Sequence, residues 1–330
     1  MTGFEHRQSA HCESGVMSSL LTYHGLPTTE PMAFGLGAAL AFAYIPFIKL
    51  SGMPLIGYRM PPRHIIKGLD KRLGLKMHSQ TFRDADRGMA ALDTLLDDGR
   101  VVGLQTSVYW LPYFPETMRF HFNAHNLIVY GRDGDDYLVS DPVFEEPVRC
   151  ARAALQKARF AKGALAARGL MYYPTVVPSS YDLDGTAHNA IKANDRYMTG
   201  APLPVIGIRG IRYLGKTIRR LAANSQKRET YLPLYLSHIV RMQEEIGTGG
   251  AGFRFMYASF LRETANNLNS DLLAEAAEML AEAGDQWRMF ALQSSKMCKG
   301  RRPLDGHELA RQLEDCAARE AATWELLKRF

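Results

Sequence analysis

The stretch from Gln8 to Gly25 reads QSAHCESGVMSSLLTYHG. Its apolar residues after Gly15 recur at helical spacing, and the final glycine, followed by Pro27, is typical of a helix terminus. We therefore expect Cys12 at or just before the first turn of a buried helix. The N–H groups and the positive dipole end of a helix start favour a thiolate there. The rest of the chain then has to provide a base for this sulfur, a group that orients the base, and a substrate pocket.

The composition indicates a globular protein with a free thiol. The chain has 330 residues, of which 46% are hydrophobic, and two domains are usual at this length. Its four cysteines form no CxxC pair and are too scattered for a disulfide framework. We therefore expect neither a metal nor a cofactor. The first seven residues, MTGFEHR, lack the apolar core of a signal peptide, which favours a cytoplasmic protein.

The longest apolar run extends from Met32 to Ile48 and contains Gly35, Gly37 and Pro46. A membrane-spanning helix usually needs about 20 apolar residues. We therefore expect a buried helix in this run and no membrane association.

The chain is basic, with a net charge of +6 and a sequence pI of about 9.1. This excess indicates either a solvated basic surface or an acidic partner, such as an acyl carrier protein. Because the sequence has no zinc finger, no aromatic RNA-binding signature and no dense Lys/Arg block, we expect no nucleic-acid partner.

The apolar periodicity changes in the middle of the chain. Up to Pro174, short strands alternate with helices, and further on only helical spacing recurs. The sequence therefore predicts an α+β catalytic domain over residues 1–174, a linker over 175–185 and an α-helical substrate or lid domain over 186–330. Helices of the second half are expected at 186–197, 206–223, 230–246, 253–266, 271–294 and 304–327.

A turn over residues 131–135 joins two predicted strands. With this turn, His125 would face Asp141, on one side of the sheet if no bulge intervenes. A carboxylate fixes the tautomer of an imidazole and stabilises its cation, which suits the base of a cysteine nucleophile. We therefore expect Cys12, His125 and Asp141 to form a triad. The competing bases are His6, His11, His24 and His121.

Gln8 lies just upstream of Cys12, so we expect its amide and the Cys12 backbone N–H to form an oxyanion hole. Each of these residue types also has an ordinary explanation. A cysteine near a helix start is usually a small buried residue, a histidine that begins a strand is usually structural, and an aspartate before proline commonly ends a strand. The order Cys, His, Asp, with a hairpin joining the last two, favours catalysis.

Three segments are candidates for the substrate pocket. Glycines lie among aromatic residues near residue 34, an aromatic loop with two prolines spans 109–115, and a glycine-rich stretch over 247–252 precedes a predicted helix. The alternatives are tight helix packing, a packed surface turn, and a tight interhelical turn with solvated charges. The candidate substrate-binding residues are Phe34, Tyr109, Trp110, Tyr113, Gly249, Gly250, Arg254 and Glu245.

These motifs carry a family resemblance. Cys12 at a helix start, HNLIV at 125–129 and the following Asp141-Pro142 resemble papain-like cysteine peptidases, including the bacteriocin-processing peptidase domain of exporters. A closer resemblance covers most of residues 4–330 and is to the butirosin biosynthesis H protein family, with the uncharacterised helical domain that often follows its N-terminal domain. The segments that carry it are HCES (11–14), FGLG (34–37), YWLPY (109–113), HFNAH (121–125) and GTGGAGFR (247–254).

The resemblance implies a papain-like fold and an acyltransferase of specialised metabolism. Such an enzyme takes an acyl or aminoacyl group from an acyl carrier protein or another acyl-thioester donor. It holds the group as a Cys12 thioester and passes it to an amine of a small polar acceptor. The alternatives are a cysteine peptidase or amidase with the same triad, and a non-catalytic binding module. Whether the chain forms a homodimer stays open.

Overall fold

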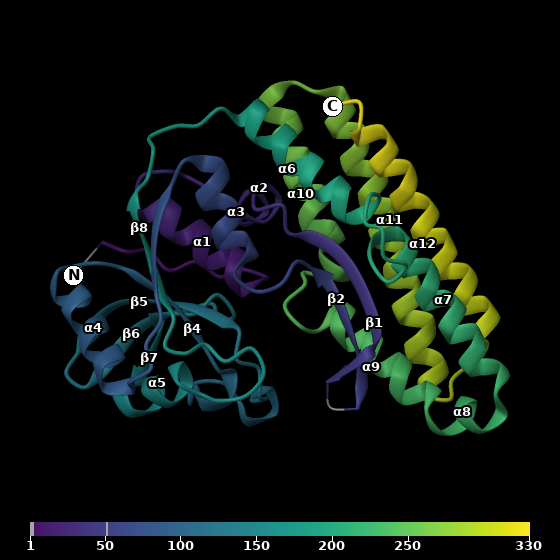
Figure 1. Cartoon of the computed structure of the whole chain (residues 1–330), viewed down its shortest axis with the longest axis horizontal. Coiled ribbons are helices and arrows are strands. Elements are labelled where there is room, and N and C mark those ends of the chain that lie inside the picture. Colours follow the sequence, from purple (N-terminus) through teal and green to yellow (C-terminus); the bar gives the residue numbers. More distant parts are fainter. Residues whose placement is uncertain (1–2, 51) are drawn as a thin grey trace. The chain divides into compact units, whose positions relative to one another are not determined.

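The computed structural model describes residues 3–50 and 52–330, which form two compact units (Figure 1). Unit 1 contains the chain up to Ala33 and Ile65–Tyr181, and unit 2 contains Phe34–His64 and Asp182–Phe330. The chain enters unit 2 for the second time inside the segment expected as a linker. The expected assignment of all of residues 1–174 to one domain is corrected, because residues 34–64 belong to the helical unit.

Unit 1 is built on an antiparallel sheet with the strand order β3-β8-β4-β5-β6-β7. The α+β prediction is therefore confirmed. One strand, β7, was not expected, because four residues are too short an alternation to recognise. The strands are β3 (Lys76–Gln80), β4 (Val102–Thr106), β5 (His125–Asp133), β6 (Asp136–Ser140), β7 (Val148–Ala151) and β8 (Met171–Val176).

Helices cover both faces of this sheet (Figure 1). On one face, α4 and α5 pack their apolar side chains on alternate residues of the strands, such as Leu104 and Leu127. On the other face, α1 contacts β5 and β8. The helical segments of unit 1 are α1 (Cys12–Tyr23), α4 (Ala85–Asp97), η1 (Val108–Trp110), η2 (Glu116–Met118) and α5 (Arg152–Arg159), and the chain crosses between the units within α2 (Glu30–Leu36) and at the start of α3 (His64–Leu73).

The hairpin that carries the candidate histidine and aspartate differs in register from the prediction. Its turn is tighter than expected, because Asp133 pairs with Asp136. A bulge then shifts the pairing by one residue between Val129 and Gly131, so that Ile128 pairs with Ser140. Relative to the expected register, the tighter turn shifts the pairing by three residues. The bulge reduces this shift to two residues, which is an even number. Because side chains alternate with a period of two, His125 and Asp141 still share a side.

The run from Met32 to Ile48 was expected to be a buried helix, and this prediction is wrong. A short helix, α2, ends before Ala38, whose φ is 53°, and the chain continues as strand β1 (Leu40–Leu50). β1 pairs with β2 (Met53–Arg59) as an antiparallel hairpin. Five of the seven residues over 42–48 are aromatic or β-branched, which suits a strand better than a helix.

This hairpin belongs to unit 2 because its side chains complete the core of the helices. The rings of Phe42 and Tyr58 lie 5.8 and 5.6 Å from the ring of Trp287. The hydroxyls of Tyr44 and Tyr235 are hydrogen-bonded at 2.7 Å. These residues are all buried, so the side chains of the hairpin have their packing partners within unit 2.

The helices of unit 2 follow the expected apolar periods closely. Figure 1 shows α7, α11 and α12 running alongside one another. Trp287 of α11 and Trp324 of α12 are fully buried. The helical segments are α6 (Leu183–Met198), α7 (Gly207–Ala223), α8 (Ser225–Thr230), α9 (Leu232–Glu244), η3 (Ala251–Phe253), α10 (Arg254–Leu268), α11 (Asp271–Cys298) and α12 (Gly306–Leu327). Of the helices described in residues 3–50 and 52–330, none is long and apolar enough to cross a membrane.

Candidate active site

Helix α1 begins at Cys12, and polar side chains bind the N–H groups around its start. His11 is the N-cap residue, and its Nδ1 accepts a hydrogen bond from the backbone N–H of Ser14 at 3.3 Å. The carboxylate of Glu30 accepts from the N–H groups of Ala10 (2.9 Å) and His11 (2.7 Å). Burial raises the pKa of Glu30, and these hydrogen bonds oppose that effect. The imidazole of His11 is thus engaged in capping the helix.

A glycine lets the segment next to Asp141 approach this helix closely. A Cβ on Gly15 would lie 2.5 Å from Cβ of Ser9 and 3.2 Å from Cβ of Pro142. The N–H of Ser9 also donates to the carbonyl of Pro142 at 2.9 Å. The sequence therefore allows the end of β6 to lie against the first turns of α1, which brings Asp141 to the side of the cysteine.

His125 and Asp141 form a buried pair. Nε2 of His125 lies 2.7 Å from Oδ2 of Asp141, and the two residues are 4% and 0% exposed. The same carboxylate oxygen accepts a hydrogen bond from the Tyr113 hydroxyl at 2.9 Å, and Oδ1 accepts from the N–H of Val143 at 3.1 Å. These donors hold the aspartate in one orientation and partly satisfy its charge, as a buried carboxylate requires.

The surroundings of His125 favour its charged form. Burial by itself lowers the pKa of this imidazole, but the charge and hydrogen bond of Asp141, together with a hydrogen bond and the charge of Cys12, raise the pKa to about 10. At neutral pH the imidazole is therefore a cation between two acidic groups. A cationic imidazole at a helix start stabilises a thiolate, which is the reactive form of cysteine.

Cys12 is only partly buried. A partly exposed cysteine that begins a helix, packed against an antiparallel sheet carrying histidine and aspartate, is the arrangement of a papain-like fold. The sulfur of such a cysteine can take an acyl group from a thioester or from an amide and hold it as a thioester. The other free cysteines, at 150, 298 and 316, are buried or half-buried, and burial raises the pKa of each thiol.

The structure gives Gln8 a different partner from the expected one. Its Nε2 donates to the carbonyl of Val143 at 3.3 Å, and the residue is exposed. Gln8 is therefore engaged at the surface, and the expectation that it forms an oxyanion hole with the Cys12 N–H is corrected. The segment before α1 is hydrogen-bonded to the carbonyls of Pro142 and Val143, through Ser9 and Gln8. The spacing of residues in the sequence does not reveal these contacts.

The competing histidines also have other partners. The ring nitrogens of His6 lie 2.7 Å from Oγ of Ser140 and 3.0 Å from the carbonyl of Phe144. The ring of His121 is stacked on Tyr109 with a centroid distance of 4.0 Å. Of the candidate bases in unit 1, His125 is the one whose imidazole is hydrogen-bonded to an aspartate and whose pKa is raised by Cys12.

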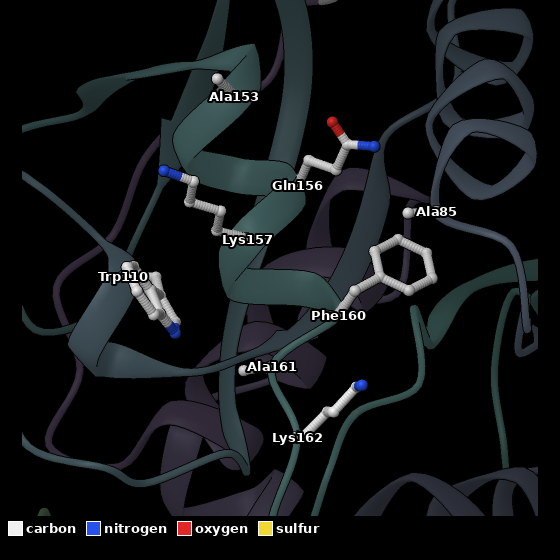
Figure 2. Close-up of a pocket in the computed structure, with 8 residues that line it drawn as sticks. All are labelled: Ala85, Trp110, Ala153, Gln156, Lys157, Phe160, Ala161 and Lys162. Atoms are coloured by element: carbon white, nitrogen blue, oxygen red, sulfur yellow. The ribbon is translucent and has the colours of Figure 1, made fainter.

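The aromatic loop has a divided role. Tyr113, expected in the substrate pocket, instead donates its hydroxyl to Asp141. Tyr109 and Trp110 are 40% exposed, and Trp110 lines a pocket of about 430 Å³ in unit 1 (Figure 2). Lys157 places its ammonium group 5.7 Å from the centre of the Trp110 ring. The pocket is lined by Ala85, Trp110, Ala153, Gln156, Lys157, Phe160, Ala161 and Lys162, so the candidate triad does not open into it.

The candidate binding residues of unit 2 are mostly structural. Phe34 is fully buried and stacked on Phe253 with a centroid distance of 5.0 Å. Arg254 is fully buried, and its guanidinium forms a paired hydrogen bond with the Glu320 carboxylate at 2.9 and 3.1 Å. Both expectations of substrate contact are therefore corrected. Glu245 is exposed as the C-cap of α9, and nothing about its position indicates a ligand.

The glycine-rich stretch 247–252 is a tight turn between α9 and η3. Gly249 and Gly250 have φ values of 66° and 86°, which favour glycine. A Cβ on Gly250 would lie 2.8 Å from the guanidinium of Arg288. The carboxylate of Glu244 also binds the N–H of Ala251 at 3.2 Å. The turn is packed against its own unit, so the interhelical alternative describes it, and the expected ligand contact of these glycines is corrected.

Two polar contacts of the site were not expected from the sequence. Tyr113 binds the candidate aspartate, and the amide of Asn126 lies 3.9 Å from the sulfur of Cys12. Asn126 could have been noticed, because it is a polar residue directly after His125 at the start of an otherwise apolar strand. Tyr113 offered no such signal, since a tyrosine in an aromatic loop is explained equally well by packing.

Two family models match the sequence. The one described as "Butirosin biosynthesis protein H, N-terminal" matches residues 11–142, which include the candidate triad, and "Domain of unknown function (DUF4872)" matches residues 153–327. Among solved structures, the chain is similar to one described as a C39-like peptidase from Bacillus anthracis. The two chains are 15% identical, the TM-score is 0.37, and the match covers 54% of this chain and 98% of that one. No curated protein is significantly similar in sequence.

Proposed function

Since the chain belongs to the family in which the butirosin biosynthesis protein H N-terminal domain precedes DUF4872, we propose that it is a cysteine acyltransferase with Cys12, His125 and Asp141 as its catalytic triad. The observation that carries this proposal is the buried His125–Asp141 pair, hydrogen-bonded at 2.7 Å, next to a cysteine at a helix start. A packing role for Cys12 does not require a charged imidazole beside it.

The proposed reaction has two halves. In the first, the Cys12 thiolate attacks the carbonyl carbon of an acyl thioester, the C–S bond to the donor breaks, and His125 gives its proton to the departing thiolate. In the second, an amine attacks the Cys12 thioester and loses a proton to His125, which releases the amide product and restores the thiolate. Asp141 keeps the imidazole in the orientation and charge state that both halves need.

For the donor we propose an acidic acyl carrier protein that docks near the pocket lined by Trp110. Two lysines, 157 and 162, line this pocket together with the exposed tryptophan ring, and the whole chain carries a net charge of +6. Acidic surfaces are attracted by such a patch, with an association rate that falls as salt is added. A cytoplasmic setting, where carrier proteins occur, is part of the same proposal.

Intact-protein mass spectrometry tests the covalent step. The protein is incubated with a short acyl thioester, and the mass of one acyl group is expected on Cys12. Cys12→Ala should lose this adduct, whereas Cys298→Ala, which removes another partly exposed cysteine, should keep it. An adduct that survives Cys12→Ala would refute the mechanism.

The second half is tested by adding small amines to the isolated adduct. Release that is faster with an amine than with water supports transfer. Release at the same rate with and without amines would show the hydrolase instead, which is the alternative reading of the same triad.

A further inference from the structure

Asn126 lies beside the reactive sulfur and has no role in the triad. It follows His125 on β5, and its side chain lies on the opposite face of the sheet from Leu127, which packs under α4 and α5. Asn126 is 2% exposed, and its Nδ2 lies 3.9 Å from Sγ of Cys12. The sulfur is thus approached by His125 and by a buried amide from consecutive residues of one strand.

The hydrogen bonds of this amide determine which of its atoms faces the sulfur. Nδ2 donates to the carbonyl of Ala124 at 3.1 Å, and a carbonyl can only accept. A reversed amide would place two acceptors against each other at that distance. Oδ1 accepts from the hydroxyl of Tyr172 at 2.8 Å. An amide nitrogen has two N–H groups, so one serves Ala124 and the second is directed at Cys12.

Tyr172 is held in place from the neighbouring strand. Its side chain is fully buried in β8, and a Cβ on Gly103 of β4 would lie 2.5 Å from Cε2 of the Tyr172 ring. The absence of a side chain at Gly103 therefore makes room for the ring. Burial is the main reason that the pKa of Tyr172 is raised, so the hydroxyl keeps its proton and acts as a donor to the amide.

We propose that Asn126 is a catalytic residue whose side-chain N–H stabilises the negative charge on the Cys12 sulfur and then on the oxyanion, with Tyr172 as the residue that positions it. The role of Asn126 toward the oxyanion rests on the proposed function. When the sulfur lone pair forms the new C–S bond, the carbonyl electron pair moves to the oxygen, about 2.7 Å from the sulfur. A donor 3.9 Å from the sulfur can then bind this oxygen at about 2.8 Å. This assigns to Asn126 the function expected of Gln8.

Two reactions of Cys12 separate the two parts of this proposal. Iodoacetamide alkylates the thiolate by displacement and forms no oxyanion, whereas acylation by a short acyl thioester forms one. Both are followed by intact mass in a Cys298→Ala background, so that labelling reports Cys12. Gln105→Ala is the matched control, because Gln105 is a buried amide paired with Asn126 in the β4–β5 register and bonded to Asn123 and Leu165.

We expect Asn126→Ala to move the alkylation profile up by about one pH unit, because one hydrogen bond to a charged group is lost, so the rate should fall about tenfold at pH values below the midpoint of the unsubstituted protein. Asn126→Asp, which keeps an acceptor for Tyr172 but places a carboxylate near the sulfur, should move the profile further. In Asn126→Ala the rate of acylation should fall by about 100-fold or more, which is a larger loss than that in the alkylation rate. Tyr172→Phe should give a smaller loss in both.

The outcomes are distinct. If Asn126→Ala matches Gln105→Ala in both reactions, Asn126 is structural and the proposal is overturned. Equal losses in alkylation and acylation would remove the oxyanion part and keep the thiolate part. If the thioester fails to acylate even the unsubstituted protein, the proposed function fails, and the alkylation profiles still decide whether Asn126 stabilises the thiolate.

Discussion

Replacing Asp141 by asparagine should uncouple the sulfur of Cys12 from its base. The substitution keeps one oxygen that can accept from His125 and Tyr113, and it loses the hydrogen bond from the N–H of Val143, because an amide NH2 cannot accept. It removes the negative charge that, with its hydrogen bond, holds the pKa of His125 at about 10 against the effect of burial. Without that charge, only the smaller effect of Cys12 opposes burial, and the pKa of His125 should fall toward the ordinary value of about 6.5.

The size of the effect follows from these values. A change from about 10 to about 6.5 corresponds to about 5 kcal/mol less in favour of the charged imidazole. At pH 7.5 the charged fraction of His125 would fall from nearly all molecules to about 10%. The Cys12 thiolate would lose its counter-ion, and its reactivity should then rise with pH as that of an ordinary thiol does, with a midpoint near pH 8.5.

The assay is the rate of Cys12 alkylation by iodoacetamide between pH 5 and 9, read by intact mass. We expect a nearly flat profile for the unsubstituted protein and, for Asp141→Asn, a rate at pH 6.5 at least about tenfold lower that rises with pH. Asp93→Asn is the matched control, because Asp93 is a carboxylate of the same unit that also binds a tyrosine hydroxyl, that of Tyr137. An unchanged profile for folded Asp141→Asn would refute the ion-pair reasoning.

Three further predictions concern the same contacts. Tyr113→Phe removes one donor to the buried Asp141 carboxylate and should destabilise the fold by about 1.5–3 kcal/mol in urea unfolding, whereas an unchanged midpoint would contradict that hydrogen bond. Glu320→Gln leaves the buried Arg254 guanidinium without a counter-charge and should cost about 3–5 kcal/mol, with the cysteine alkylation rate of the folded protein unchanged. The raised pKa of His125 contributes stability that is complete below about pH 6.5 and is lost as the pH rises through about 10, so the urea midpoint should fall over this window less steeply in His125→Ala.

The local sequence was sufficient to identify many elements. The periodicity of residues 16–21 and the signals that end the helix predicted α1, and the long helices of unit 2 were recognised from the same kind of pattern. Such signals are local, because a helix is formed by contacts between residues three and four apart. The pairing of His125 with Asp141 was also expected, but by a register that the structure replaces.

Elements and contacts that depend on partners far along the chain could not be predicted from the local sequence. The run from Met32 to Ile48 is partly a strand because Phe42 finds Trp287 far along the chain. Arg254 was interpreted as a binding residue because its ion pair with Glu320 spans 66 positions. An isolated sequence window contains no information on such partners, so packing in the tertiary structure overrides local preference.

By itself, the sequence therefore determined the residue types that chemistry requires, a cysteine at a helix start and a histidine and an aspartate on one hairpin. Only the tertiary structure decided which polar groups surround them. The turn and bulge returned His125 and Asp141 to one side of the sheet, Gln8 was bound to Val143, and the amide of Asn126 was directed at the sulfur. The physical reason is that a side chain's neighbours are set by strand register and by contacts between segments far apart in the chain, whereas residue identity and local periodicity are written in the sequence itself.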